Sequence, residues 1–228
     1  MPASPPYLYS RPRDDAGRAL LTTGFAAGVV AFVAGTVAVA GWLTLATDGP
    51  FSTLDAVTTM TAGSPVPAVF TPIWTFCGTM GLPVQLVETT GHGRAIVSRN
   101  LVDVFDGAGD AWVWMGAIPP ACLVLAGAAT ARLTAWNRRP AEGFATGASV
   151  ALGFAAAVAA VALVARFGLG DIPPTSEGVV RIGATGFPPS DLDGDSVGIP
   201  LWGVVSGLVF GLVFGGLGGA AASLSPFK

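Results

Sequence analysis

The chain alternates long uncharged apolar stretches with shorter segments that carry nearly all of its charge. The apolar stretches cover residues 19–46, 112–133, 143–166 and 197–224. Each exceeds the roughly 20 residues that an α-helix needs to cross a hydrocarbon core about 30 Å thick. Charge enters them only at the end of the second and third stretches, as Arg132 and Arg166. The pattern predicts an all-α fold, a polytopic transmembrane helical bundle with four spans.

The distribution of basic residues predicts the orientation of these spans. Four spans place the 1–18 tail, the 134–142 loop and the 225–228 tail on one side, together with seven of the 11 Lys and Arg residues. Positive charge is enriched in short cytoplasmic segments. We therefore expect a multi-pass protein of the plasma membrane with both termini in the cytoplasm. The 47–111 and 167–196 loops then lie outside, with 11 of the 14 acidic residues.

One further uncharged segment, residues 69–87, allows two interpretations. It is either a fifth span or a re-entrant or interfacial segment, and Pro72, Gly78, Gly81 and Pro83 weaken a continuous helix through it. A fifth span would move Arg138 and Arg139 to the outer side, so the charge pattern favours four. The first apolar stretch also has a small-x-small sequence at Ala38–Ala40, but it is longer than the apolar core of a signal peptide. An uncleaved first span is favoured.

The two outer loops differ in composition. The 47–111 loop is apolar in its middle, so we expect it to pack on the outer ends of the spans as a mixture of short elements without a core of its own. The 167–196 loop is rich in glycine and proline and is expected to be irregular.

Glycine recurs every fourth residue in the fourth apolar stretch, a glycine-zipper pattern. Residues four apart lie nearly on one helix face, so the pattern predicts a groove that another backbone can approach closely. The third stretch continues Gly143 and Gly147 with alanines at 151, 155 and 159, and the first contributes a shorter pair. Packing within the bundle is the favoured interpretation; homo-oligomerisation through this face and a sliding gate helix are the alternatives. The candidate helix-packing residues are Gly203, Gly207, Gly211, Gly215, Gly219, Gly143, Gly147, Gly24 and Gly28.

Composition supports the membrane assignment and removes several classes of protein. Hydrophobic residues make up 52% and charged residues 11% of the chain, and 11 basic residues against 14 acidic ones leave no basic surface. A disordered chain and a nucleic-acid-binding domain are therefore excluded. The expected partners are the lipid bilayer and either a second copy of the chain or another membrane protein, with no nucleic acid.

Residues that could carry chemistry are few, and each has a simpler structural interpretation. His92 lies in a glycine-rich turn, and Cys77 and Cys122 are expected to be unpaired apolar residues. Asp191, Asp193 and Asp195 alternate as in calcium loops but lack the EF-hand spacing, so a hydrated turn is favoured over a cation site. The Pro119–Pro120 pair is interpreted as a kink or restart of the second span. We predict no catalytic residue, no metal and no cofactor, and therefore no enzyme.

The order of features resembles a group of small haloarchaeal four-span membrane proteins of unassigned function, some of which are labelled transporters. The resemblance rests on NLVDVF at 100–105, AIPPACLVLAG at 117–127 and VFGGLGG at 213–219. It implies an archaeal plasma membrane and no known catalytic residues. The absence of ionisable groups from the span interiors argues against proton-coupled transport. We therefore expect a protein of structural or interaction type, an accessory subunit or small oligomer, with a channel or facilitator for a small solute as the alternative.

Overall fold

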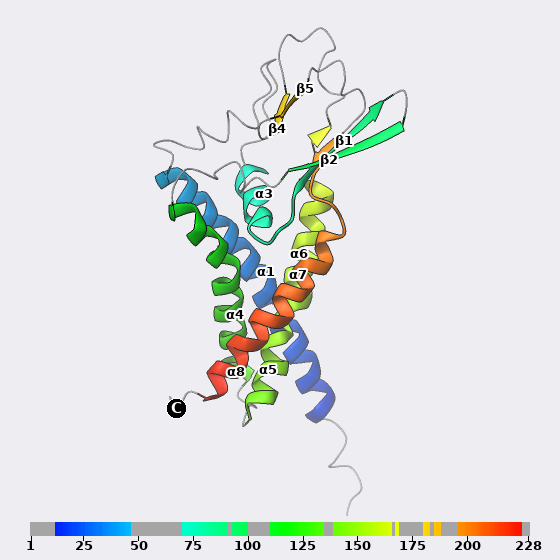
Figure 1. The fold of residues 1–228 in the computed structure, drawn as a ribbon. Helices are drawn as coiled ribbons and strands as arrows, with labels where there is room; N and C mark the ends of the chain where they lie inside the picture. Colours follow the sequence, from blue (N-terminus) through cyan, green and yellow to red (C-terminus); the bar gives the residue numbers. More distant parts are fainter. Residues whose placement is uncertain are drawn as a thin grey trace, which may run out of the picture.

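The structure is a computed structural model. It describes residues 12–46, 70–90, 93–99, 110–134, 139–165, 167–168, 180–182, 185–187 and 196–224. Among these residues, four helices are long and apolar enough to cross a membrane: Gly17–Leu45, Trp114–Thr134, Pro140–Val164 and Gly203–Leu224. The fold is therefore a polytopic helical bundle with four spans (Figure 1).

The first span belongs to α1 (Pro12–Ala46), a helix of 35 residues. At 1.5 Å per residue it is about 50 Å long, well above the ~30 Å of a hydrocarbon core. Figure 1 shows it crossing the bundle obliquely behind the other helices. It packs mainly on α6 (Val150–Val164) and on α4 (Ile118–Thr134). The helix begins at Pro12, seven residues before the apolar stretch begins at residue 19.

The second span starts with a 3₁₀ helix, η2 (Asp110–Ala117), and continues as α4. Pro119 and Pro120 lie in the first turn of α4. The N–H groups of a first turn have no partner within the helix, so proline is tolerated there. The proline pair therefore marks the start of an α-helix and does not kink its middle.

The third and fourth spans are each built from shorter helical pieces. The third consists of α5 (Pro140–Ala148) and α6 (Val150–Val164), joined at Ser149. The fourth consists of α7 (Gly203–Phe210), a π-helical segment η5 (Gly211–Gly215) and α8 (Gly216–Leu224). The fourth helix begins at Gly203, six residues after the start of the apolar stretch, because residues 196–198 form a strand.

The ambiguous 69–87 segment forms a short helix followed by a strand. Helix α3 (Phe70–Gly78) has nine residues and so is too short to cross a bilayer. The chain then turns at Gly81, which has a φ of 76°, and enters β1 (Val84–Thr90). In Figure 1, α3 lies at the end of the bundle that carries the strands, which we call the outer end. It lies between α1 and α4 on one side and α6 and α7 on the other.

The described strands lie beyond the outer end of the bundle. A four-stranded sheet has the order β2-β1-β6-β3, and its neighbouring strands are antiparallel. It contains β1, β2 (Gly93–Arg99), β6 (Ser196–Gly198) and β3 (Phe167–Gly168). A separate hairpin joins β4 (Val180–Ile182) and β5 (Thr185–Phe187). The 167–196 loop, expected to be irregular, thus contributes strands to both sheets, because its polar backbone finds partners there.

The apolar core lies in the outer half of the bundle. Three aromatic rings from three helices meet edge to face: Phe32 of α1, Phe76 of α3 and Phe154 of α6. Their centroids are 5.2, 5.6 and 6.2 Å apart. Phe76 rests on Gly35, where a Cβ would lie 2.6 Å from the ring Cζ atom. The absence of a side chain at Gly35 therefore lets α3 dock against α1.

Candidate functional site: the glycine-lined helix interfaces

The fourth span packs against the third along its glycine face. From the inner end outward, Gly219 faces Gly143 and Gly147, Gly215 faces Gly147, Gly211 faces Ala151, and Gly207 faces Ala155 and Val158. All four of these glycines are buried. Because the partner groups are mostly backbone atoms or small side chains, the backbones of the two antiparallel helices lie in direct contact.

The approach is closest at the inner end and in the middle. A Cβ at Gly211 would lie 2.5 Å from the Ala151 Cα atom, and a Cβ at Gly143 would lie 2.5 Å from the Gly219 carbonyl oxygen. Conversely, a Cβ at Gly219 would meet the Gly143 carbonyl oxygen. The α-hydrogens of this pair therefore point at each other's carbonyl groups, the arrangement of a weak Cα–H···O contact.

The outer end of the same face has different neighbours. A Cβ at Gly207 would lie 3.5 Å from the Ala155 Cα atom, and one at Gly203 would lie 3.0 Å from a Leu82 methyl group. Gly203 thus packs on Leu82, in the turn that follows α3. Helices α6 and α7 remain packed on each other at this end, with side chains between their backbones.

The glycines of the first span also face the third span. Gly24 lies against Ser149, and Gly28 lies against the Val150 carbonyl oxygen. In the opposite direction, Gly153 of α6 lies against the Phe25 carbonyl oxygen of α1. The third span is therefore held between α1 and the fourth span by glycine on both sides.

Besides Gly153, two further helix-packing residues that join the fourth span to α4 fall outside the pattern of fourth-residue glycines. Gly127 of α4 lies against the Gly215 carbonyl oxygen, and Gly218 lies against the Val124 carbonyl oxygen. The signal in the sequence was the doubled glycine at 215–216 and 218–219, which offers two side-chain-free faces. The fourth span packs on the third span along one of these faces and on α4 along the other.

The polar side chains within the spans bond to their own helices. The Thr130 hydroxyl donates to the Ala126 carbonyl oxygen at 2.9 Å, and Ser149 donates to that of Thr146 at 2.6 Å. Thr36 and Ser223 make the same kind of bond to Phe32 and Ala220. Hydroxyls that bond a preceding helical carbonyl contribute little polarity to a pathway.

A long-range hydrogen bond fixes α3 to the bundle. The Trp74 indole Nε1–H donates to the Ala165 carbonyl oxygen at 3.1 Å, and both residues are buried. Ala165 directly follows α6, where helical carbonyls lack a partner within the helix. The indole therefore caps the outer end of the third span. In contrast, the buried Nε1–H of Trp42 has no acceptor among the described residues.

The remaining candidates from the sequence are two cysteines, one histidine and three aspartates. Cys77 and Cys122 are free, and burial raises the pKa of the Cys77 thiol from 9.0 to about 12. His92 and the aspartates at 191, 193 and 195 lie outside the described residues. Within the described ranges, no three His, Cys, Asp or Glu residues are grouped as a metal site would require.

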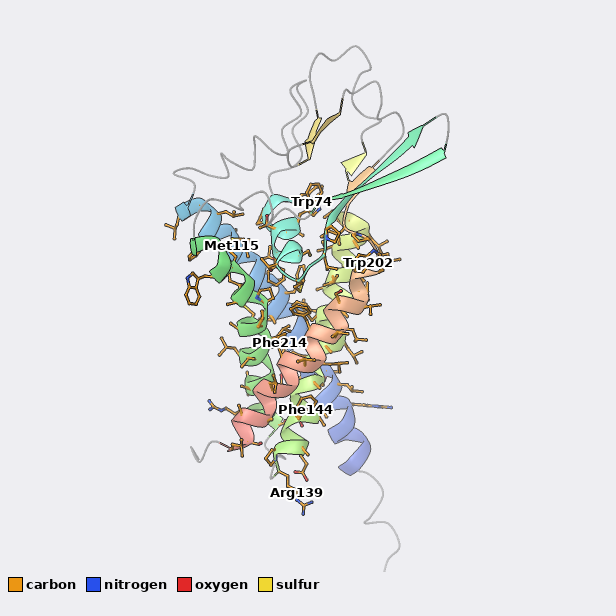
Figure 2. All side chains as sticks on the ribbon, viewed as in Figure 1. Trp74, Met115, Arg139, Phe144, Trp202 and Phe214 are labelled. Carbon is orange, nitrogen blue, oxygen red and sulfur yellow. The ribbon has the colours of Figure 1, made fainter. Side chains whose placement is uncertain are left out.

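Aromatic side chains are exposed near the outer end of the bundle. Trp114 of η2 is 69% exposed. Trp202, just before α7, is 51% exposed and is labelled in Figure 2. Indoles are enriched at the boundary between lipid and water. Their placement agrees with helices that end at a membrane surface.

These features define the class of the protein: a multi-pass membrane protein whose four spans are packed through small residues. The chain belongs to a family of unknown function, DUF7978, whose profile matches residues 9–226. No match was found among curated proteins or among solved structures.

Proposed function

We propose that this chain is a membrane protein of structural or interaction type, an accessory subunit of another membrane protein. Its bundle would anchor an outer layer, by which we mean the 47–111 and 167–196 loops with the helix and strands that they contain, and this layer would bind the partner. The observation that supports this best is the filling of the bundle. Buried aromatic and aliphatic side chains fill its outer half, and glycine contacts close its inner half. A conducting path needs polar groups or water along its length.

The location of the partner surface follows from which faces are already used. The glycine faces of the first, third and fourth spans are buried against each other. A partner would therefore bind elsewhere, and the outer layer is the best candidate. The 47–111 and 167–196 loops carry 11 of the 14 acidic residues, so a partner with a basic outer surface would be favoured. The proposal places both termini in the cytoplasm of a haloarchaeal cell.

A facilitator for a small solute is the second candidate, and one observation favours it. The third and fourth spans both depart from a regular α-helix, at Ser149 and in the π-helical segment Gly211–Gly215. Interrupted spans form the substrate sites of several transporter folds. Here the interruptions face each other through glycine, alanine and valine, which offer a solute no polar side chain.

The test is a leak assay in proteoliposomes that contain a trapped pH-sensitive dye and an imposed proton gradient. We expect the gradient to decay as in protein-free vesicles. A decay that depends on protein, and that Gly207→Leu slows, would contradict the proposal and favour the facilitator. In parallel, crosslinking in native membranes with an amine- and carboxyl-reactive reagent should link the chain to a discrete membrane protein. A crosslinked product that contains only this chain would replace the accessory-subunit proposal with a homo-oligomer.

A further inference from the structure

The interruptions of the third and fourth spans lie at the same depth in the bundle. A Cβ at Gly211 would lie 2.5 Å from the Ala151 Cα atom, and one at Gly215 would lie 2.6 Å from a Val150 methyl group. Val150 and Ala151 directly follow Ser149, where the hydrogen bonding of the helix is irregular and the N–H of Ser149 bonds the Thr146 carbonyl oxygen at 3.2 Å. The π-helical segment of one span therefore faces the irregular point of the other.

The helical halves on the inner side of this level form one unit. Helices α5 and α8 pack on each other and on α4. Their contacts run backbone to backbone, between Gly143 and Gly219 and between Gly218 and Val124. Close packing without side chains leaves these three helices little freedom to separate without losing the contacts outright.

The helical halves on the outer side form a second unit. Helices α6 and α7 pack on each other, and the strands next to them pair: Phe167 of β3 stands opposite Val197 of β6. The outer end of α6 and the outer start of α7 are therefore joined in one sheet. Figure 1 shows this pair diverging from α1 and α4, with α3 between them.

The contacts of α3 bridge the two sides of this divergence. Phe76 rests on Gly35 of α1 and lies 6.2 Å, centroid to centroid, from Phe154 of α6. Trp74 donates its hydrogen bond to Ala165 at the end of α6. The ring contacts are apolar and non-directional, whereas the hydrogen bond fixes α6 at a single point.

We propose that the fold contains a hinge with a latch. The outer unit of α6, α7, β3 and β6 swings about Ser149 and Gly211–Gly215 against the inner unit of α4, α5 and α8. The Trp74–Ala165 hydrogen bond is the latch that holds the end of α6 against α3, while β6 pairs with β1 beyond it. Helix breaks and π-helical segments bend more readily than a continuous α-helix, and hinges concentrate at such positions. The motion goes beyond the proposed interaction role, because it would shift the outer sheet relative to the membrane.

The hinge can be tested with pairs of spin labels in the full chain, reconstituted in nanodiscs. A Cys77→Ala, Cys122→Ala background removes the native thiols. One pair joins the outer unit to η2, the 3₁₀ helix that continues into α4, at Val164 and Trp114, which are 74% and 69% exposed. The reference pair lies within the inner unit, at Leu133 and Leu224, which are 76% and 69% exposed. Distance distributions are recorded for the parent, for Trp74→Phe, and for Trp42→Phe as a control that removes an indole without a described acceptor.

We expect Trp74→Phe to add a second, longer distance to the outer pair while the inner pair stays unchanged. Trp42→Phe should leave both distributions as in the parent. An outer distribution that is unaltered by Trp74→Phe would overturn the hinge, as would equal broadening of the inner pair, which indicates general loosening. A measurement on the unsubstituted protein keeps the proposal testable if Trp74→Phe does not fold. Backbone amides at 149–151 and 211–215 should exchange with deuterium faster than those of α7 and α8, and equal rates throughout would also overturn it.

Discussion

The indole N–H of Trp74 reaches the carbonyl oxygen of Ala165, 91 residues further along the chain, at 3.1 Å. The bond joins a nine-residue helix to the end of a membrane-spanning one. Both partners are nearly inaccessible to solvent, with 1% and 2% of their surface exposed. A buried hydrogen bond of this kind determines where α3 can dock, because either group left alone would be buried without a partner.

The first prediction compares two tryptophans in the outer half of the bundle. Trp74→Phe should lower the free energy of unfolding by about 1–3 kcal/mol more than Trp42→Phe does, since only the former leaves a buried carbonyl unpaired. Both substitutions remove the same ring atoms. Unfolding of the purified protein in mixed micelles, followed by circular dichroism against denaturing detergent, measures the difference. Equal losses would mean that the Trp74 bond contributes nothing beyond packing.

A second prediction concerns the glycine face. Gly211→Ala places a methyl group 2.5 Å from the Ala151 Cα atom, so the third and fourth spans must separate. Overpacking of this kind typically costs about 1–3 kcal/mol. Gly41→Ala is the matched control, because no described atom lies within 4 Å of its Cβ position. It should be neutral or stabilising by up to about 1 kcal/mol through helix propensity. Thermal unfolding in detergent compares the stability of the two variants. If Gly41→Ala lowered the stability and Gly211→Ala left it unchanged, the packing role of Gly211 would be refuted.

The third prediction follows from the burial of Cys77. The thiol should stay neutral and resist alkylation by iodoacetamide at pH 8 in the folded protein, and react once the chain is unfolded. Cys122, which is partly exposed, is replaced by serine in this experiment. Rapid modification of the folded protein would show that α3 leaves the bundle on the time scale of the reaction.

The same thiol predicts a loss of stability at high pH. Its pKa is about 12 in the folded protein against an ordinary value of 9.0, so the unfolded chain loses the proton first. The stabilising contribution is complete below pH 9 and is lost as the pH rises from 9 toward 12. In denaturation curves between pH 7 and 10.5, the parent should lose more stability than Cys77→Ala. Parallel curves for the two proteins would contradict the assigned burial.

A further prediction concerns orientation in the membrane. The excess of basic residues on the side of the chain ends predicts that a cysteine at Ala141 is shielded from a membrane-impermeant maleimide in intact cells. A cysteine at Ser176, in the second outer loop, should be labelled. The background again lacks Cys77 and Cys122, and permeabilised cells show that both positions can react. Labelling at Ala141 in intact cells would reverse the topology.

The sequence by itself determined the number and approximate extent of the spans. A backbone in lipid must satisfy its own hydrogen bonds, so an uncharged run of 20 or more residues forms a helix whatever its neighbours are. Glycine every fourth residue likewise produces a face without side chains from helical geometry alone. Neither inference needs a contact between distant residues, and both depend only on local pattern.

Tertiary structure decided everything that depends on a partner. Within residues 69–87, α3 docks on the bundle because Trp74 donates a hydrogen bond to Ala165 and Phe76 packs on Gly35. The chain then continues into β1. The fourth helix begins at Gly203 because residues 196–198 pair with β1 and β3. Gly203 faces Leu82 because the turn that follows α3 packs on the start of α7. In each case a polar group formed a hydrogen bond, or an apolar group was buried, with atoms far away in the chain. Such pairings have no signature in the local sequence.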